Sequence, residues 1–153
     1  EAFISTIGIA STIDPGNYSA NDTALVLLDV LSAPPTGISA NFSFSLNDVV
    51  LAPGATKENL VATVLGNIIS HEVGHYIGNF HTDGFNTFQG IMDEGPGCLF
   101  NLAGIGPSGI FGEADTMNVV FIDEMYSTRE GFIGDENTTL ISAFAFSFFP
   151  FGP

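Results

Sequence analysis

One stretch decides how this chain folds and what it can bind: His71-Glu72-Val73-Gly74-His75-Tyr76-Ile77-Gly78-Asn79-Phe80-His81, which contains all three of its histidines. Residues four apart on a helix share a face, so His71 and His75 can direct their rings at one metal ion. Gly78 follows where the helix must end in a left-handed residue, a conformation that glycine adopts without steric cost. The turn that Gly78 permits would return His81 to the same ion.

The residue types in this stretch indicate a zinc site that is open to chemistry. Three neutral imidazoles leave the fourth tetrahedral position to a water molecule, whose pKa zinc lowers towards about 7. Glu72 is rotated away from the ligand face, where it can reach that water rather than the metal. We therefore predict zinc ligands at His71, His75 and His81 and a general base at Glu72. A structural zinc would instead be closed by a fourth protein ligand and would not need Glu72.

The pattern H-E-x-x-H-x-x-G-x-x-H, followed by Gln89-Gly90-Ile91-Met92-Asp93, resembles the signature of the metzincin zinc metallopeptidases. The resemblance implies that Met92 lies in a methionine turn beneath the zinc, and that Gly78 and Met92 support the site. Thr82 after the third histidine is similar to the pappalysin branch, although the subfamily stays open. Astacins and serralysins carry a tyrosine where Glu94 stands here, so we expect no tyrosine ligand.

Apolar patterning predicts three strands before the motif, over residues 3–12, 23–31 and 41–51. Thr56 is placed to cap a helix over residues 57–76, whose last turn would carry the first two histidines. The buried stripe of this helix is predicted, at helical spacing, at Leu60, Val61, Val64, Leu65, Ile68 and Ile69.

The resemblance also implies how these elements are organised within a single domain, residues 1–153. We expect an α+β, metzincin-like fold in which residues 1–78 form a small twisted sheet over the active-site helix. Residues 79–153 would form a loop-rich lower subdomain with the methionine turn and a Phe-rich terminal strand. In that strand, over residues 140–151, phenylalanines alternate with small residues, which favours one apolar and one small face. It would be an inner strand of its own sheet or an edge strand that adds to a neighbour's.

The charge of the chain limits its partners. Seventeen acidic residues against two basic ones give a net charge of −15, which repels nucleic acid and anionic membranes and attracts cations. Residues 106–115 resemble Gly/Asp-rich loops of bacterial extracellular proteins that hold calcium, with Glu113 and Asp115 as candidate ligands. Ser108 stands where an aspartate is expected, so a plain pair of turns remains the alternative.

Several features favour a secreted, extracellular protein. Cys98 is the single cysteine, which excludes an internal disulfide, and the start at Glu1 without a methionine indicates a processed product or an excised piece. The mean hydropathy is +0.36, yet no apolar run reaches the roughly 20 residues of a membrane span. Sequons that predict a glycoprotein occur at Asn17, Asn21, Asn41 and Asn137.

Two hypotheses about function follow. The first is a zinc endopeptidase whose protein or peptide substrate lies extended across the active-site helix, with residues 41–51 as the candidate edge strand that binds it. The second is an extracellular assembly, filament or adhesion subunit that keeps the zinc and cleaves little or nothing. Its homo-oligomer or fibre would form through the Phe-rich terminal strand. A serine or cysteine protease would need a histidine that is not committed to zinc, and none is left.

Overall fold

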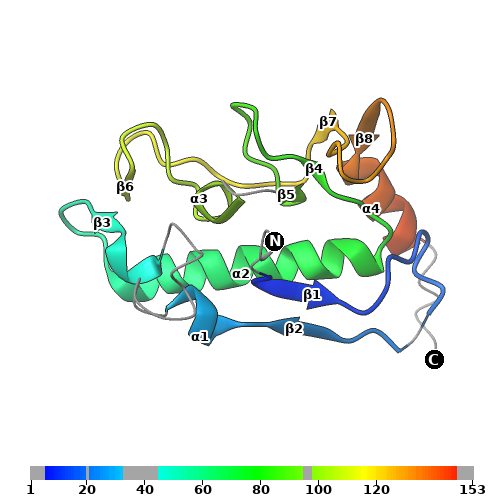
Figure 1. Cartoon of the computed structure of the whole chain (residues 1–153), viewed down its shortest axis with the longest axis horizontal. Coiled ribbons are helices and arrows are strands. Elements are labelled where there is room, and N and C mark those ends of the chain that lie inside the picture. The colour runs from blue at the N-terminus through cyan, green and yellow to red at the C-terminus, as the bar shows by residue number, and fades with distance from the viewer. Residues whose placement is uncertain (1–5, 20, 33–44, 95–97, 148–153) are drawn as a thin grey trace, which may run out of the picture.

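The computed structural model describes residues 6–19, 21–32, 45–94 and 98–147, which form a small mixed α/β fold (Figure 1). Its helices are α1 (Leu28–Leu31), α2 (Lys57–Tyr76), α3 (Cys98–Leu102), α4 (Thr138–Ser147) and the 3-10 helix η2 (Leu46–Asp48). Its strands are β1 (Gly8–Ala10), β2 (Ala24–Val26), β3 (Val50–Leu51), β4 (Thr82–Asp83), β5 (Asp93–Glu94), β6 (Ile110–Phe111), β7 (Asp123–Met125) and β8 (Asp135–Asn137). None of the described helices has the length and apolar character that crossing a membrane requires.

The helix predicted over residues 57–76 is confirmed with the same bounds as α2. Thr56 caps it, because its hydroxyl accepts a hydrogen bond from the backbone N–H of Asn59 at 3.2 Å. Leu60, Val64 and Ile68 are buried in the main hydrophobic core, as predicted. Val61 and Leu65 are only partly buried and Ile69 is 48% exposed, so the predicted stripe was too wide.

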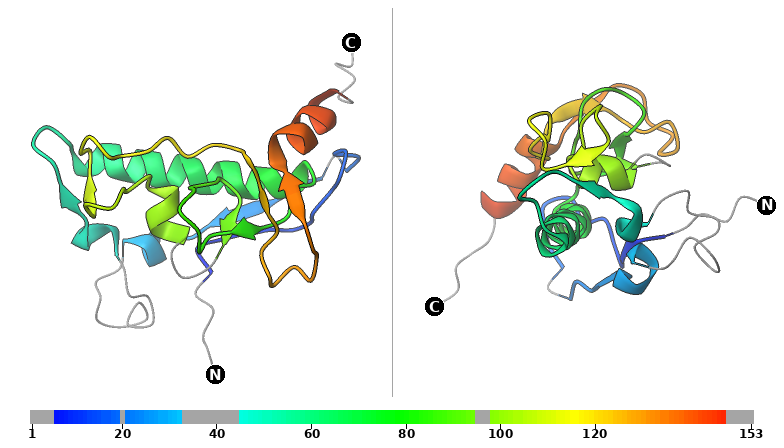
Figure 2. Two further views of the ribbon diagram at one scale, coloured as in Figure 1. Left: turned by 90° about the horizontal axis from the view of Figure 1, so that it is seen from above. Right: turned by 90° about the vertical axis from the view of Figure 1, so that its left-hand side faces the viewer.

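A two-stranded sheet packs along α2 (Figure 2). Strands β1 and β2 pair antiparallel with Gly8 opposite Val26, which confirms a strand within each of the predicted segments. The strand predicted over residues 23–31 is wrong beyond Val26, because α1 occupies residues 28–31. A continuous aliphatic run carries no period that separates a strand from a helix.

The predicted strand over residues 41–51 is also largely wrong. Its first four residues lie outside the described ranges, and the rest is η2 followed by the two-residue β3. Ser45 favours the 3-10 turn, because its hydroxyl accepts from the backbone N–H of Asn47 at 3.2 Å. Strand β3 pairs in parallel with β6 and does not extend the β1–β2 sheet.

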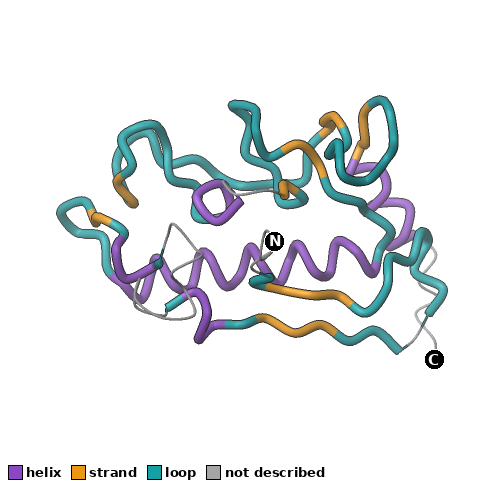
Figure 3. The backbone as a smooth tube through the Cα atoms, viewed as in Figure 1, coloured by secondary structure: helices purple, strands orange, loops and turns teal. Residues whose placement is uncertain are grey.

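Residues 79–94 and 98–147 cross the opposite side of α2 and consist mostly of loops (Figure 3). Three further two-stranded sheets hold these loops and their neighbours: β3 with β6, β4 with β5, and β7 with β8. The loop-rich second half agrees with the sequence. The described residues nevertheless form separate small sheets rather than the single upper sheet of a metzincin, and the fold that they show is the mixed α/β one.

The Phe-rich terminal segment is a helix, α4, up to Ser147, and the predicted strand is wrong there; residues 148–151 lie outside the described ranges. Near its start, the side-chain oxygen of Asn137 accepts from the backbone N–H of Leu140 at 2.8 Å. The buried positions of α4 are Thr138, Ser142 and Ala145, which recur at helical spacing. Small residues therefore face the protein, and Phe144 and Phe146 are exposed.

Glu136, in β8, joins this C-terminal part to the loop after α2. Its side chain is 1% exposed, and its Oε1 accepts a hydrogen bond from the backbone N–H of Phe80 at 2.9 Å. Burial, helped by the charge of Glu130, raises the pKa of Glu136 to about 7. The fold therefore favours the neutral carboxyl over the carboxylate.

We predict from this pKa that wild-type protein loses stability relative to the Glu136→Gln variant as pH rises. A folded pKa above the ordinary value of 4.5 means that the folded state binds more protons between pH 4.5 and about 7. The contribution of Glu136 is therefore fully present below pH 4.5 and is lost as pH rises through 7, a difference on the order of 3 kcal/mol at most. Urea unfolding of both proteins from pH 4 to 8, in the presence of a metal chelator, measures this difference in the free energy of unfolding. A stability difference that does not vary with pH would contradict the assignment.

Candidate metal centre

The last two turns of α2 carry two of the three histidines. His71 and His75 continue the buried line of Leu60, Val64 and Ile68, so the face that is apolar in the first half of the helix carries imidazoles in the second. Both histidines are buried, with 8% and 6% of their surface exposed. Helical spacing thus fixes the two side chains on one rigid element, as the sequence predicted.

Gly78 turns the chain back towards the third histidine. Its φ of +98° is a left-handed conformation, and its N–H donates to the carbonyl of His75 at 2.9 Å. A Cβ at this position would lie 2.4 Å from Cα of Pro15, so both the conformation and the space require glycine. The predicted function of Gly78 as a turn is confirmed by this geometry.

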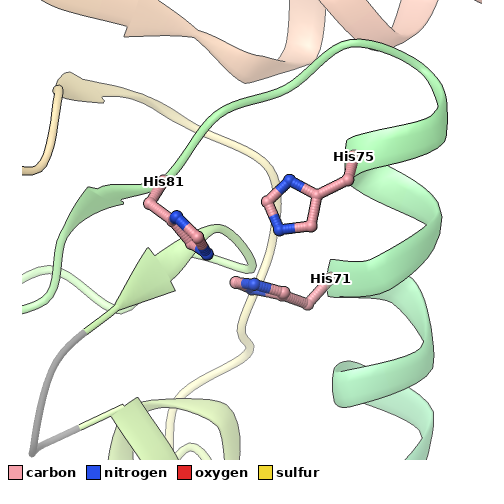
Figure 4. A group of neighbouring side chains, drawn as sticks. All are labelled: His71, His75 and His81. Atoms are coloured by element: carbon pink, nitrogen blue, oxygen red, sulfur yellow. The ribbon is translucent and has the colours of Figure 1, made fainter. Parts of the chain in front are cut away.

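The three imidazole rings converge on a common space (Figure 4). The centroid of the His71 ring lies 4.9 Å from that of His75 and 5.2 Å from that of His81, and the His75 and His81 centroids are 4.7 Å apart. A ring nitrogen of each lies within 4.8 Å of a ring nitrogen of the others. The sequence-predicted ligands are therefore close enough together to hold one metal ion.

Each ring is held by a hydrogen bond at Nδ1. His71 Nδ1 is 2.7 Å from the carbonyl oxygen of Ile91, and His75 Nδ1 is 2.8 Å from the carbonyl oxygen of Asn79. A carbonyl oxygen only accepts, so both Nδ1 atoms carry the proton and Nε2 keeps its lone pair. His81 Nδ1 lies 2.5 Å from the side-chain Oε1 of Glu130. This is the arrangement that orients histidine ligands in metal sites.

Burial keeps the helix histidines in the form that binds metal. Burial, together with the neighbouring imidazoles of His75 and His81, lowers the pKa of His71 to about 3. Burial also lowers the pKa of His75 below its usual value. Both helix rings are therefore neutral at pH 7, and a neutral imidazole is a donor suited to zinc.

The Gly90–Asp93 turn contacts α2 beside the histidines. Met92 is 1% exposed, and a Cβ on Gly74 would lie 2.3 Å from its sulfur, so the thioether packs directly on the helix between His71 and His75. The turn supplies the Ile91 carbonyl that holds His71, and the Met92 carbonyl accepts from the backbone N–H of Thr82 at 2.9 Å. Met92 therefore packs against α2 at Gly74, and its support of a metal site stays a prediction from the resemblance.

Glu72 lies one residue along from His71 and is 4% exposed. Its carboxyl group faces β1, where the backbone N–H of Ala10 donates to it and where a Cβ on Gly8 would lie 2.1 Å from its Oε1. Burial raises the pKa of Glu72 to about 7. The absence of a side chain at Gly8 therefore provides the space for this carboxyl group.

Two glutamates that the sequence did not identify as site residues lie beside His81. Glu130 bonds its ring, and Oε2 of Glu94 is 3.4 Å from the same Nδ1. Glu94 in turn accepts from the hydroxyl of Ser127 and lies 3.6 Å from Nε of Arg129. Glu130 is 49 residues from His81, so no spacing rule within the motif could have found it.

The candidate calcium ligands, Glu113 and Asp115, are not part of the histidine cluster. Asp115 accepts hydrogen bonds from the backbone N–H of Ser108 at 2.8 Å and from its hydroxyl at 3.0 Å, which closes the loop on itself. Among the described residues, the groups of three that could hold a metal contain neither Glu113 nor Asp115. Calcium binding by this loop stays a prediction from the sequence.

No family model, curated protein or solved structure matches this chain. The likeness to metzincins is therefore confined to the sequence pattern over residues 71–93, and the assignment of a function depends on the chemistry of the residues themselves.

We expect Gly78→Ala to destabilise the protein more than Gly54→Ala. Both glycines have positive φ, +98° and +94°, which costs an alanine about 1–2 kcal/mol. A Cβ at Gly54 meets open space, whereas at Gly78 it meets the backbone of Pro15. Urea unfolding of the metal-free proteins measures the free energy of unfolding of each variant. The difference between the two losses is the cost of the contact between the added Cβ and Pro15. Equal losses would show that Pro15 moves away freely.

We also expect His75→Ala to release the metal and Glu72→Gln to retain it. The first change removes a nitrogen donor, whereas the second alters a side chain that faces β1. Zinc content after gel filtration, measured by elemental analysis, distinguishes the two variants. Full zinc retention by His75→Ala would contradict the ligand assignment.

Proposed function

We propose that this protein is a zinc-dependent endopeptidase that hydrolyses peptide bonds in protein or peptide substrates. One observation carries the proposal: the three imidazoles lie close enough together to hold one ion, and Nδ1 of each already has a hydrogen-bond partner, which leaves Nε2 as the donor atom. Zinc in such a site would act as a Lewis acid on a peptide carbonyl and would lower the pKa of a water molecule. Three protein ligands leave a position open, as catalytic zinc sites do.

Glu72 is the residue of this chain that would move the proton. In the proposed reaction its carboxylate oxygen accepts a proton from the attacking water and later donates it to the leaving amine. Glu72 directly follows His71 in α2, and its carboxyl group fills the space that Gly8 leaves and accepts from the backbone N–H of Ala10 in β1. Because Glu72 is 4% exposed, bulk water has little access to that oxygen.

Helix α4 favours a second candidate, an extracellular assembly or adhesion subunit on a metal-binding scaffold. Leu140, Phe144 and Phe146 are 65%, 50% and 58% exposed, an unusual concentration of large apolar groups on one short helix. In this proposal the metal stabilises the fold and copies of the chain associate through α4. It replaces the terminal strand that the sequence suggested for assembly.

A single experiment separates the two candidates. Zinc-loaded protein is incubated with a quenched peptide library and with a denatured protein, and Glu72→Gln is the matched control because it keeps the side-chain size and the metal ligands. The endopeptidase predicts cleavage in wild type and a loss of roughly 100-fold or more in Glu72→Gln.

Light scattering on the same samples gives the second measurement. Absence of Glu72-dependent cleavage together with large assemblies would exclude the endopeptidase and support the assembly subunit. Cleavage by a monomeric species would exclude the assembly subunit.

A further inference from the structure

We propose that Glu130 is the positioning residue for the third metal ligand: it fixes the tautomer and orientation of His81 and so sets the affinity of the site. This inference depends on the metal site proposed above and concerns how that site is built. In this proposal the turn at residues 127–130, which is distant from the motif in the sequence, contributes to metal binding.

His81 needs such a partner more than the other two histidines do. His71 and His75 project from the last turns of a long helix, whose backbone fixes where their side chains begin. His81 lies in the loop between α2 and β4, and its side chain is 29% exposed against 8% and 6% for the two whole helix residues. A less buried side chain on a loop samples more rotamers, so its orientation depends on hydrogen bonds.

Glu130 holds both the ring and the backbone of His81. Its Oε1 lies 2.5 Å from Nδ1 of the ring and 3.2 Å from the backbone nitrogen of the same residue. The backbone N–H of Ser127 also donates to the carbonyl of His81 at 2.9 Å, and Glu130 N–H closes the turn on the Ser127 carbonyl at 3.0 Å. One turn therefore bonds the N–H, the carbonyl and the ring of His81, which locks all three relative to one another.

The distances favour a hydrogen bond over a second metal position at this place. Nδ1 of His81 and carboxylate oxygens of Glu94 and Glu130 lie within 4.8 Å of one another, which is a spacing that a metal ion could use. Two ligands at about 2.1 Å from one ion and about 90° apart are separated by about 3 Å. The 2.5 Å between Nδ1 and Oε1 of Glu130 is shorter than that, and it lies closer to the about 2.7–2.9 Å of a charge-assisted N–H···O hydrogen bond.

The hydrogen bond has a defined consequence for the metal. With its proton on Nδ1 and directed at a carboxylate, the His81 ring presents Nε2 as the donor, and the carboxylate makes that nitrogen more basic. The helix histidines bond neutral carbonyls, whereas His81 bonds the carboxylate of Glu130, and Oε2 of Glu94 lies farther away, at 3.4 Å from the same nitrogen. Loss of such a partner typically costs about 10–100-fold in metal affinity.

The test compares Glu130→Ala and Glu130→Gln with wild type and with Asp135→Asn. The alanine variant removes the acceptor, whereas the glutamine variant keeps an oxygen acceptor and removes the charge. Asp135 is an exposed carboxylate in neighbouring β8, so its change to asparagine matches the change in charge without touching His81. Zinc affinity is measured by competition with a chromogenic chelator, and the visible absorption bands of the Co²⁺-loaded proteins report ligand geometry.

We expect one zinc per chain in wild type, a loss of about 10–100-fold in affinity with altered Co²⁺ bands in Glu130→Ala, and a smaller loss in Glu130→Gln. Asp135→Asn should match wild type in both measurements. Urea unfolding of the metal-free variants checks that the fold is intact, and the glutamine variant carries the test if the alanine variant does not fold.

Distinct results would overturn distinct claims. Unchanged zinc affinity and Co²⁺ bands in both Glu130 variants would refute the positioning function and leave the three-histidine site standing. Two zinc ions per chain in wild type, one of which is lost in Glu130→Ala, would show that a second metal ion, not a hydrogen bond, joins His81 and Glu130. Absence of zinc from wild type would refute both the site and this inference.

Discussion

The hydrogen bonds to the three Nδ1 atoms are the constraint on which the candidate site depends. Bringing three imidazoles together is useful only if each ring presents a lone pair to the same point, and an unbonded ring can present a proton instead. Here the acceptors come from three different places: the Gly90–Asp93 turn, the loop after α2, and Glu130. The ligand set therefore requires that distant parts of the chain be packed correctly around one helix end.

The Gly90–Asp93 turn explains how that packing is achieved on one side. Met92 fills the space over Gly74, so the absence of a side chain at Gly74 allows the turn to approach the helix closely enough for Ile91 to reach His71. Asp93 then anchors the turn: its carboxylate accepts from Thr82, from the backbone N–H of Gly90 and from Asn101. Packing at Met92 and hydrogen bonding at Asp93 thus both position the turn that carries the Ile91 carbonyl.

The C-terminal part of the protein contributes from the other side through small residues. Ser142 on α4 accepts from the side-chain amide of Asn79 at 3.0 Å, and the carbonyl of Asn79 holds His75. A bulky residue at 142 would keep α4 away from this loop. The phenylalanines of α4 consequently face outward, and the helix supports the loop that holds His75 while it exposes an apolar surface.

The sequence by itself determined the features that local chemistry controls. The bounds of α2, its Thr56 cap, the turn at Gly78 and the pairing of His71 with His75 follow from helical period, side-chain capping and backbone freedom, which act within a few residues. Only the tertiary structure decided the rest. The terminal phenylalanines alternate with small residues, which predicted a strand, but the segment forms α4 because its small residues pack on the protein at helical spacing. The aliphatic run over residues 23–31, also predicted as one strand, contains both β2 and α1. Glu130 reached His81 because two segments 49 residues apart were folded against each other, and contacts at that range leave no spacing in the sequence from which they can be read.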